Sequence, residues 1–184
     1  MFYQYWDKLL KNSVDVKRMY RTRDFIDKEV FLIGGKKLGV VSGILVDLKD
    51  KKVKSLMINH FGIFKKKYVA YNDIISIGSK IIVGRISSPY GINLDRILMK
   101  NVYDKNGILR GNVSDVLIGE QTMELEGIIC YSGLKNKIKS GNILIPFSEI
   151  IFGDEYILDK GNGHITFNSV IHKAEEVMLN ENSK

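Results

Sequence analysis

The residues best suited to binding chemistry are lysines in two short runs of the first half of the sequence. These are Lys49, Lys51, Lys52 and Lys54 in one run and Lys65, Lys66 and Lys67 in the other. Phe61, Phe64 and Tyr68 are interleaved with the second run. Ammonium groups beside aromatic rings suit phosphate contact combined with base stacking, and they also suit an anionic lipid surface. The alternative is a solvated surface that keeps the protein soluble.

Charge is divided unequally between the two halves of the sequence. Residues 1–85 hold 18 Lys and Arg against 8 Asp and Glu, a balance of +10. Residues 86–184 hold 10 against 13, a balance of −3. This split indicates an anionic partner for the first half, reached through the two lysine runs.

Side chains that could perform catalysis or hold a metal ion are scattered along the sequence. His60, His164 and His172 stand at no metal-ligand spacing from one another or from Cys130. Gly34-Gly35 lacks the Lys-Ser/Thr and the helix that a phosphate-binding loop requires, and no nucleophile elbow occurs. We therefore expect no catalytic residue, no metal ion and no organic cofactor, and we expect that the protein is not an enzyme.

The acidic residues Asp47, Asp73 and Glu149 stand at strand ends and turns. There we expect their carboxylates to accept hydrogen bonds from backbone N–H groups. Cys130, the single cysteine, ends an apolar run and is expected to be a small core residue. A lone thiol forms no internal disulfide, and no apolar stretch approaches the roughly 20 residues of a membrane-spanning helix. These features favour a cytoplasmic location.

The elements that must position these residues occur twice. Gly35 and Gly39 precede a long apolar strand that ends at Asp47, and Gly107 and Gly111 follow at an offset of 111 − 39 = 72 residues. Self-similarity at one fixed spacing predicts two related domains in tandem.

The long strand of the first copy is apolar on both faces. In strict alternation Leu38, Val40, Ser42, Ile44 and Val46 face one side, and Val41, Gly43 and Leu45 face the other. A strand buried on both sides is typical of a small barrel.

Each copy resembles the PRC-barrel domain, a small all-β barrel named after the H subunit of the photosynthetic reaction centre. A related domain forms the C-terminal half of the ribosome maturation factor RimM. The resemblance rests on the glycine pair, on the long strand, and on the segment 69–75, which 145–151 repeats at an offset of 150 − 74 = 76. It covers residues 24–158 and implies assembly, scaffolding or RNA-processing roles, with no shared catalytic residues. The second copy departs from the first at Gly119, which replaces Asp47, and at Gln121-Thr122, which replaces the lysine turn.

We predict an all-β protein of two tandem small PRC-like β-barrels with short terminal helical segments. Residues 24–86 form the first barrel, residues 92–167 the second, and residues 168–184 a C-terminal helix and tail. Residues 1–23 form an aromatic and basic segment. This segment either lies on an anionic membrane or packs on the body of the protein or on a second copy.

The predicted function is that of a non-catalytic adaptor or assembly protein, which binds a macromolecular partner through the seven lysines. The partner is expected to be a protein, and a homo-oligomer remains open. One alternative is an RNA-binding factor in ribosome or RNA maturation, by analogy with RimM. Another is a peripheral membrane scaffold that uses the aromatic N-terminus.

Overall fold

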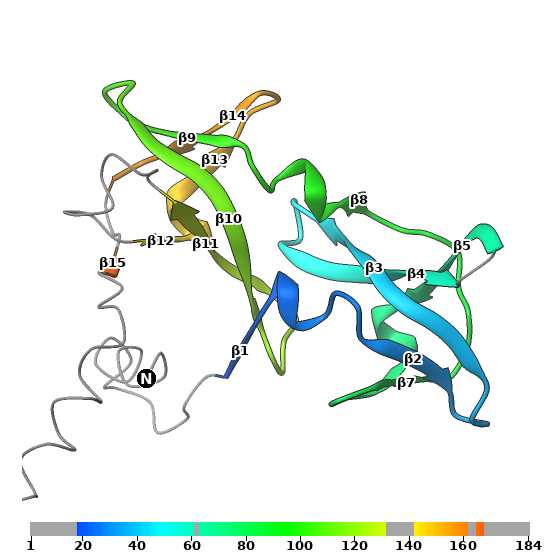
Figure 1. The fold of residues 1–184 in the computed structure, drawn as a ribbon. Coiled ribbons are helices and arrows are strands. Elements are labelled where there is room, and N and C mark those ends of the chain that lie inside the picture. The colour runs from blue at the N-terminus through cyan, green and yellow to red at the C-terminus, as the bar shows by residue number, and fades with distance from the viewer. Residues whose placement is uncertain (1–17, 61–62, 132–141, 162–164, 168–184) are drawn as a thin grey trace, which may run out of the picture.

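The computed structural model describes residues 18–60, 63–131, 142–161 and 165–167. Within these ranges most residues lie in strands, and the helical elements are 3₁₀ turns of three residues each. The strands form two curved sheets, one mainly from each copy (Figure 1). The predicted all-β class and the two tandem units are confirmed. The expected terminal helical segments fall on residues 1–17 and 168–184, outside the described residues.

The first sheet has the strand order β5-β4-β3-β2-β7-β6. Its strands are β2 (Glu29–Leu32), β3 (Lys37–Asp47), β4 (Lys52–His60), β5 (Ile63–Ala70), β6 (Ile74–Ile77) and β7 (Ile81–Val83). Neighbouring strands pair antiparallel except β2 and β7, which run parallel. The turn η2 (Tyr71–Asp73) leads from β5 into β6.

The second sheet repeats this plan in the order β13-β14-β9-β10-β11-β12, with one more strand beside β12. Its strands are β9 (Asn101–Asp104), β10 (Leu109–Gly119), β11 (Leu125–Tyr131), β12 (Asn142–Pro146), β13 (Ile150–Phe152), β14 (Tyr156–Asp159) and β15 (Ile165–Phe167). Here β14 and β9 are the parallel pair, as β7 and β2 are in the first sheet. The turn η5 (Phe147–Glu149) leads into β13 as η2 leads into β6.

The glycines that mark the repeat have the same backbone role in both copies. Gly39 has a φ of 144° and Gly111 a φ of 145°, a conformation that residues with a side chain rarely adopt. A Cβ atom on Gly39 would lie 2.0 Å from the carbonyl oxygen of Asn59 on the neighbouring strand. Glycine is therefore required where β3 and β4 come together.

The strict alternation predicted for the long strand is wrong at its centre. The pairing of β3 with β4 shifts register between Val41 and Gly43, and its pairing with β2 shifts between Lys37 and Gly39. Val41 is therefore fully buried in the core, whereas Val40 is only half-buried. Each β-bulge inserts one residue and turns the following side chains to the opposite face of the sheet.

Each sheet also receives one strand from the other half of the chain. β1 (Met19–Arg21) precedes the first copy but pairs with β10 of the second. β8 (Ile92–Asn93) precedes the second copy but pairs with β3 of the first. Tyr20 lies opposite Ile118, and Ile92 lies opposite Val46. Tyr20 and Ile92 are 72 residues apart, and so are Val46 and Ile118, so each pair is the repeat of the other. The exchange is reciprocal.

The hairpins β3–β4 and β10–β11 meet at the local two-fold axis of this exchange. The Val53 N–H donates to the Met123 carbonyl at 2.9 Å, and the Leu125 N–H donates to the Lys51 carbonyl at 2.8 Å. Between these bonds Lys52 pairs with Glu124, its own counterpart at 124 − 52 = 72. Their side chains form a salt bridge, with Nζ and Oε1 3.2 Å apart.

The main hydrophobic core extends through both halves, and a smaller cluster of Leu117, Ile129 and Leu144 lies in the second half. The main core includes Phe25 and Val41 from the first half and Val113 and Ile157 from the second, all fully buried. Tyr20 of β1 and Ile92 of β8 are partly buried against it. The 3₁₀ turns η1 (Thr22–Asp24) and η3 (Leu94–Arg96) follow the exchanged strands and lead the chain back into its own half.

Because the strands are exchanged and the core is continuous, the two halves should unfold together. We expect one calorimetric transition, with equal calorimetric and van't Hoff enthalpies. The substitution Ile92→Asp should lower the free energy of unfolding by about 2 kcal/mol, since it places a charge against the core. The whole transition should shift with it.

The matched control is Ile33→Asp, because the Ile33 side chain is 71% exposed. That change should stay within about 0.5 kcal/mol of the wild type. Two separate calorimetric transitions, only one of which moves with Ile92→Asp, would contradict the shared core.

Candidate functional site

The first lysine run lies at the β3–β4 hairpin, and two of its four members form salt bridges. Lys52 pairs with Glu124, and Lys54 Nζ lies 2.7 Å from Asp50 Oδ2 and 5.7 Å from the centre of the Tyr90 ring. The hydrogen bond to Asp50 raises the pKa of Lys54. Lys49 and Lys51 have exposed side chains.

The second lysine run lies on β5, beside the opposite end of β4. Lys67 on β5 pairs with Ile58 near the end of β4, whereas Lys52 begins β4. At about 3.3 Å per residue the two ends are about 20 Å apart, more than twice the screening length of about 8 Å at physiological salt. Lys66 is exposed and Lys67 half-buried, and the side chain of Lys65 lies outside the described part of the structure. The two runs therefore do not form one patch.

The acidic residues singled out from the sequence have different surroundings. Asp47 Oδ1 accepts hydrogen bonds from the backbone N–H groups of Lys49 (2.8 Å) and Asp50 (3.1 Å), as expected. Both hydrogen bonds lower the pKa of Asp47, and the one from the Asp50 N–H has the larger effect.

For Asp73 and Glu149 the expectation of backbone N–H partners is wrong. Asp73 binds two side chains of the segment after β7, the Ser87 hydroxyl at 2.5 Å and Arg85 Nε at 2.8 Å. Oε2 of Glu149 is buried without a hydrogen-bond partner among the described residues. The Asp73 carboxylate thus fixes the returning chain to the first sheet, a long-range contact that local sequence does not encode.

Cys130 is fully buried in the core, as expected of a small core residue. Burial, with a further contribution from Asp159, raises the pKa of its thiol to about 12. A buried thiol of such high pKa is a poor nucleophile. In the ranges that the structure describes, no group of three or more His, Cys, Asp or Glu residues is placed to hold a metal ion. Within the same ranges, no helix has the length and apolar character that crossing a membrane requires.

The second half buries charged groups that sequence reasoning missed. Asp104 and Asp159 are neighbours on β9 and β14, where the first half pairs Leu32 with Val83. Asp104 Oδ1 accepts from the N–H groups of Asn106 and Ile108, at 2.9 Å each, and Asp159 Oδ1 accepts from that of Gly161 at 2.8 Å. Arg110 Nε lies 3.6 Å from Asp104 Oδ2. The two aspartates thus hold turns in place, and Arg110 neutralises part of their charge, so we assign these three residues a structural role.

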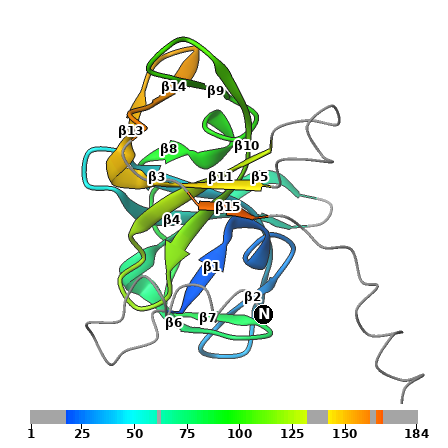
Figure 2. The ribbon, with the colours of Figure 1, turned by 90° about the vertical axis from the view of Figure 1, so that its left-hand side faces the viewer.

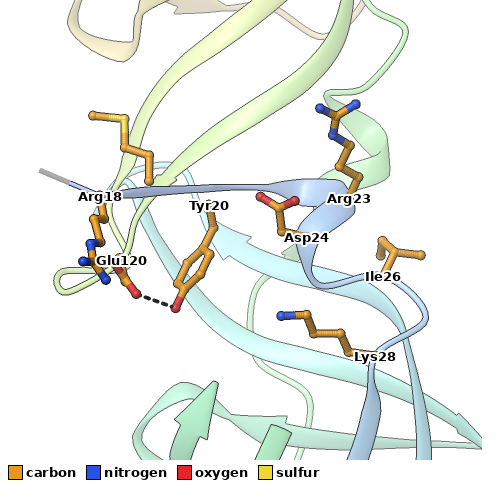
Figure 3. Close-up of a pocket in the computed structure, with 8 residues that line it drawn as sticks. Arg18, Tyr20, Arg23, Asp24, Ile26, Lys28 and Glu120 are labelled. Carbon is orange, nitrogen blue, oxygen red and sulfur yellow. Dashed lines mark hydrogen bonds between the residues drawn. The ribbon is translucent and has the colours of Figure 1, made fainter. Parts of the chain in front are cut away.

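A hollow of about 930 Å³ lies beside the exchanged strand β1. Its lining residues are Arg18, Met19, Tyr20, Arg23, Asp24, Ile26, Lys28 and Glu120. Figure 3 shows Arg18, Tyr20 and Glu120 at one end of it and Arg23, Asp24 and Lys28 toward the other. The Tyr20 hydroxyl donates to Glu120 Oε1 at 3.1 Å, and Lys28 Nζ donates to the Gly78 carbonyl at 2.6 Å.

The hollow combines side chains of both charge signs with the apolar side chains of Met19 and Ile26, and its described lining residues include no Ser, Thr, Cys or His. Such a lining can bind a partner that combines polar and apolar groups. The sequence signal was the basic group Arg18, Arg21 and Arg23, which the sequence alone places in the N-terminal segment. Only the pairing of β1 with β10 brings Glu120 of the second half to these residues.

A family model described as PRC-barrel domain matches the chain twice, over residues 17–87 and over residues 91–170. The two matched ranges begin just before the exchanged strands β1 and β8, so each includes the strand that it gives to the other half. No curated protein matches the chain.

Tyr20 allows the hollow to be tested through alkaline pH. Burial, followed by the hydrogen bond to Glu120, raises its pKa from 10.0 to about 12. The neutral hydroxyl therefore stabilises the fold fully below pH 10, and this contribution disappears as the pH rises to about 12. We expect the free energy of unfolding to fall less steeply over this window in Tyr20→Phe than in the wild type.

The measurement is chemical denaturation at a series of pH values. Tyr156→Phe serves as a control, because the Tyr156 side chain is 49% exposed, and it should follow the wild type. Equal slopes for wild type and Tyr20→Phe would show that Tyr20 is not held by Glu120 in solution.

Proposed function

The chain belongs to the PRC-barrel family, with one copy in each half, and on this premise we propose that it is a non-catalytic adaptor that binds a macromolecular partner. The observation that carries the proposal is the reciprocal strand exchange. It joins two copies with different surfaces into one body with a shared core. An adaptor needs such rigidity, because a fixed spacing between two surfaces lowers the entropic cost of engaging both.

The outer surfaces of the two copies lie at opposite ends of the molecule. In Figures 1 and 2 the strands β9, β13 and β14 are at one end, and β2 and β7 are at the other. The first half carries the balance of +10 and the second that of −3, so the ends suit partners of different charge. The buried Cys130, a poor nucleophile, supports a binding role over thiol chemistry. We place the protein in the cytoplasm on the basis of its single thiol.

The adaptor function predicts a protein partner that co-purifies at a defined ratio. The full chain, tagged and cross-linked in its source cell, should enrich one or a few proteins far above the tag alone, as measured by quantitative mass spectrometry. A purified chain that enriches no protein but converts a small molecule would contradict the proposal.

A second candidate function is RNA binding by the first half, which the basic balance favours. Exposed Lys49, Lys51 and Lys66 provide contacts for phosphate groups. Because the two lysine runs are about 20 Å apart, a single RNA would have to span both ends of β4 and contact both runs to bind.

RNA binding can be tested with a labelled uridine oligonucleotide and fluorescence anisotropy at several salt concentrations. The logarithm of the affinity should fall linearly with the logarithm of salt, and removing one lysine that binds a phosphate should reduce the slope by about 0.7. Changing Lys65, Lys66 and Lys67 together to Glu should abolish binding and leave the thermal midpoint nearly unchanged.

The matched control is Lys105→Glu, an exposed lysine of the second half, which should leave the affinity unchanged. Binding that survives the triple change would show that these lysines are only a solvated surface.

A further inference from the structure

A row of apolar side chains crosses the outer face of the second sheet. Leu109 of β10 lies opposite Tyr103 of β9, Tyr103 lies opposite Leu158 of β14, and Leu158 lies opposite Ile151 of β13. Directly paired residues of neighbouring strands point to the same face, so these four side chains form one line. Tyr156 joins it two residues before Leu158, with its ring edge-on to that of Tyr103 at 5.6 Å. We name Tyr103, Leu109, Ile151, Tyr156 and Leu158 the second-half stripe.

The second-half stripe is exposed rather than covered by the described residues. Leu109 is 52%, Ile151 50% and Tyr156 49% exposed. Tyr103 and Leu158 are half-buried between them. A single exposed apolar side chain is ordinary, but a contiguous row of five is characteristic of an interaction surface.

The first half shows that the fold does not require this row. Lys37 stands in the place of Leu109, Phe31 in that of Tyr103, and Lys80 in that of Tyr156 (109 − 37 = 72, 103 − 31 = 72 and 156 − 80 = 76). Lys80 Nζ lies 4.8 Å from the centre of the Phe31 ring, and both lysines form salt bridges with Glu29. Lys80 therefore covers the Phe31 ring, and the ion network gives this part of the first sheet a charged surface, although Ile75, the counterpart of Ile151 (151 − 75 = 76), is 55% exposed.

The two copies also differ in the charge of the residues at this position. Where the first half has Glu29 between its two lysines, the second half has Asn101, at 101 − 29 = 72. All three members of the ion network are thus replaced by uncharged residues, while the strand pairing around them is unchanged. The pairing of β9 with its two neighbours is thus kept, whereas the β13–β14 hairpin lacks the register shift found between β6 and β7.

One end of the stripe opens into a hollow of about 420 Å³ with acidic residues at its edge. It is lined by Ile151, Gly153, Asp154, Glu155, Tyr156 and Leu158. Lys100 Nζ holds the loop in place through the carbonyl groups of Gly153, at 2.8 Å, and Asp154. The two carboxylates of the loop are exposed and belong to the half that carries the net negative charge.

We propose that the second-half stripe docks a segment of a partner protein in which an apolar or aromatic side chain stands beside a lysine or arginine. The apolar side chain enters the hollow against Ile151 and Leu158, and the cation lies near Asp154 and Glu155. The acidic edge disfavours nucleic acid and anionic lipid, because both carry phosphate charge. This inference rests on the adaptor function and assigns one of its two surfaces.

The test uses a phage-displayed library of random peptides on the immobilised full chain. Selected peptides should combine apolar or aromatic residues with adjacent Lys or Arg, and their affinities can be measured by fluorescence anisotropy. The double variant Leu109→Lys, Tyr156→Lys gives the second half the residues of the first, so its fold should be kept. It should weaken binding at least about tenfold, which corresponds to 1.4 kcal/mol.

Two further variants separate the contributions. Asp154→Lys with Glu155→Lys should weaken the basic peptides and reduce the salt dependence of binding. Ile33→Lys, which changes an isolated exposed apolar residue of the first half, should leave the affinities unchanged. Calorimetric midpoints equal to that of the wild type should confirm that each variant is folded.

Three outcomes would overturn the proposal. The library could yield no apolar-basic peptides, or the selected peptides could bind the double variant as well as the wild type. Sedimentation could also show that the wild type is a dimer and the double variant a monomer, which would make a second copy of the chain the occupant of the stripe. If the protein partner captured from cells stays bound to the double variant, the adaptor function stands and the assignment of the stripe fails.

Discussion

The structure depends on backbone hydrogen bonding between the two halves around one local two-fold axis. The hairpins β3–β4 and β10–β11 join through Val53, Met123, Leu125 and Lys51, and the exchanged strands β1 and β8 complete the sheet of the opposite half. Each half alone would leave a strand of its sheet missing and the core exposed at that position. The hydrophobic core is continuous because the strands that cover it come from both halves. The hollow beside β1 exists for the same reason, since its lining includes residues from both copies.

A shared backbone has allowed the two copies to diverge in their side chains. The bulged long strand, the glycine at its start and the 3₁₀ turn before β6 or β13 are the same in both. Inside the second half, however, Asp104 and Asp159 stand where the first half has Leu32 and Val83. Buried charges cost free energy unless hydrogen bonds and ion pairs compensate for them. Here turn N–H groups bind one oxygen of each aspartate and Arg110 pairs with Asp104, so the compensation is partial: Asp159 Oδ2 is buried without a hydrogen-bond partner among the described residues.

The same divergence on the outside gives the molecule its two different ends. The first half carries two lysines and a glutamate around Phe31, whereas the second has uncharged residues there and an acidic edge beside its apolar row. In a protein of two separate domains a linker would let these surfaces move independently. The exchanged strands fix them instead at opposite ends of one body, which suits an adaptor that must hold two contacts at a set distance.

The sequence by itself determined the two copies, their β-class, and the positions of most strands. Those features follow from local signals: Gly39 and Gly111 require a special backbone conformation, and apolar runs between turn residues specify strands. The buried Cys130 followed from its apolar run in the same way.

What only the tertiary structure decided is where residues distant in sequence meet. The bulges that bury Val41 depend on pairing with two neighbouring strands, and the partners of Asp73 come from the chain returning after β7. The distance between the two lysine runs depends on their placement at opposite ends of β4. The strand exchange leaves no trace in local propensity, because a short strand such as β1 has the same pattern whichever sheet it joins. The choice between its own half and the other is made by burial and hydrogen bonding across the whole molecule.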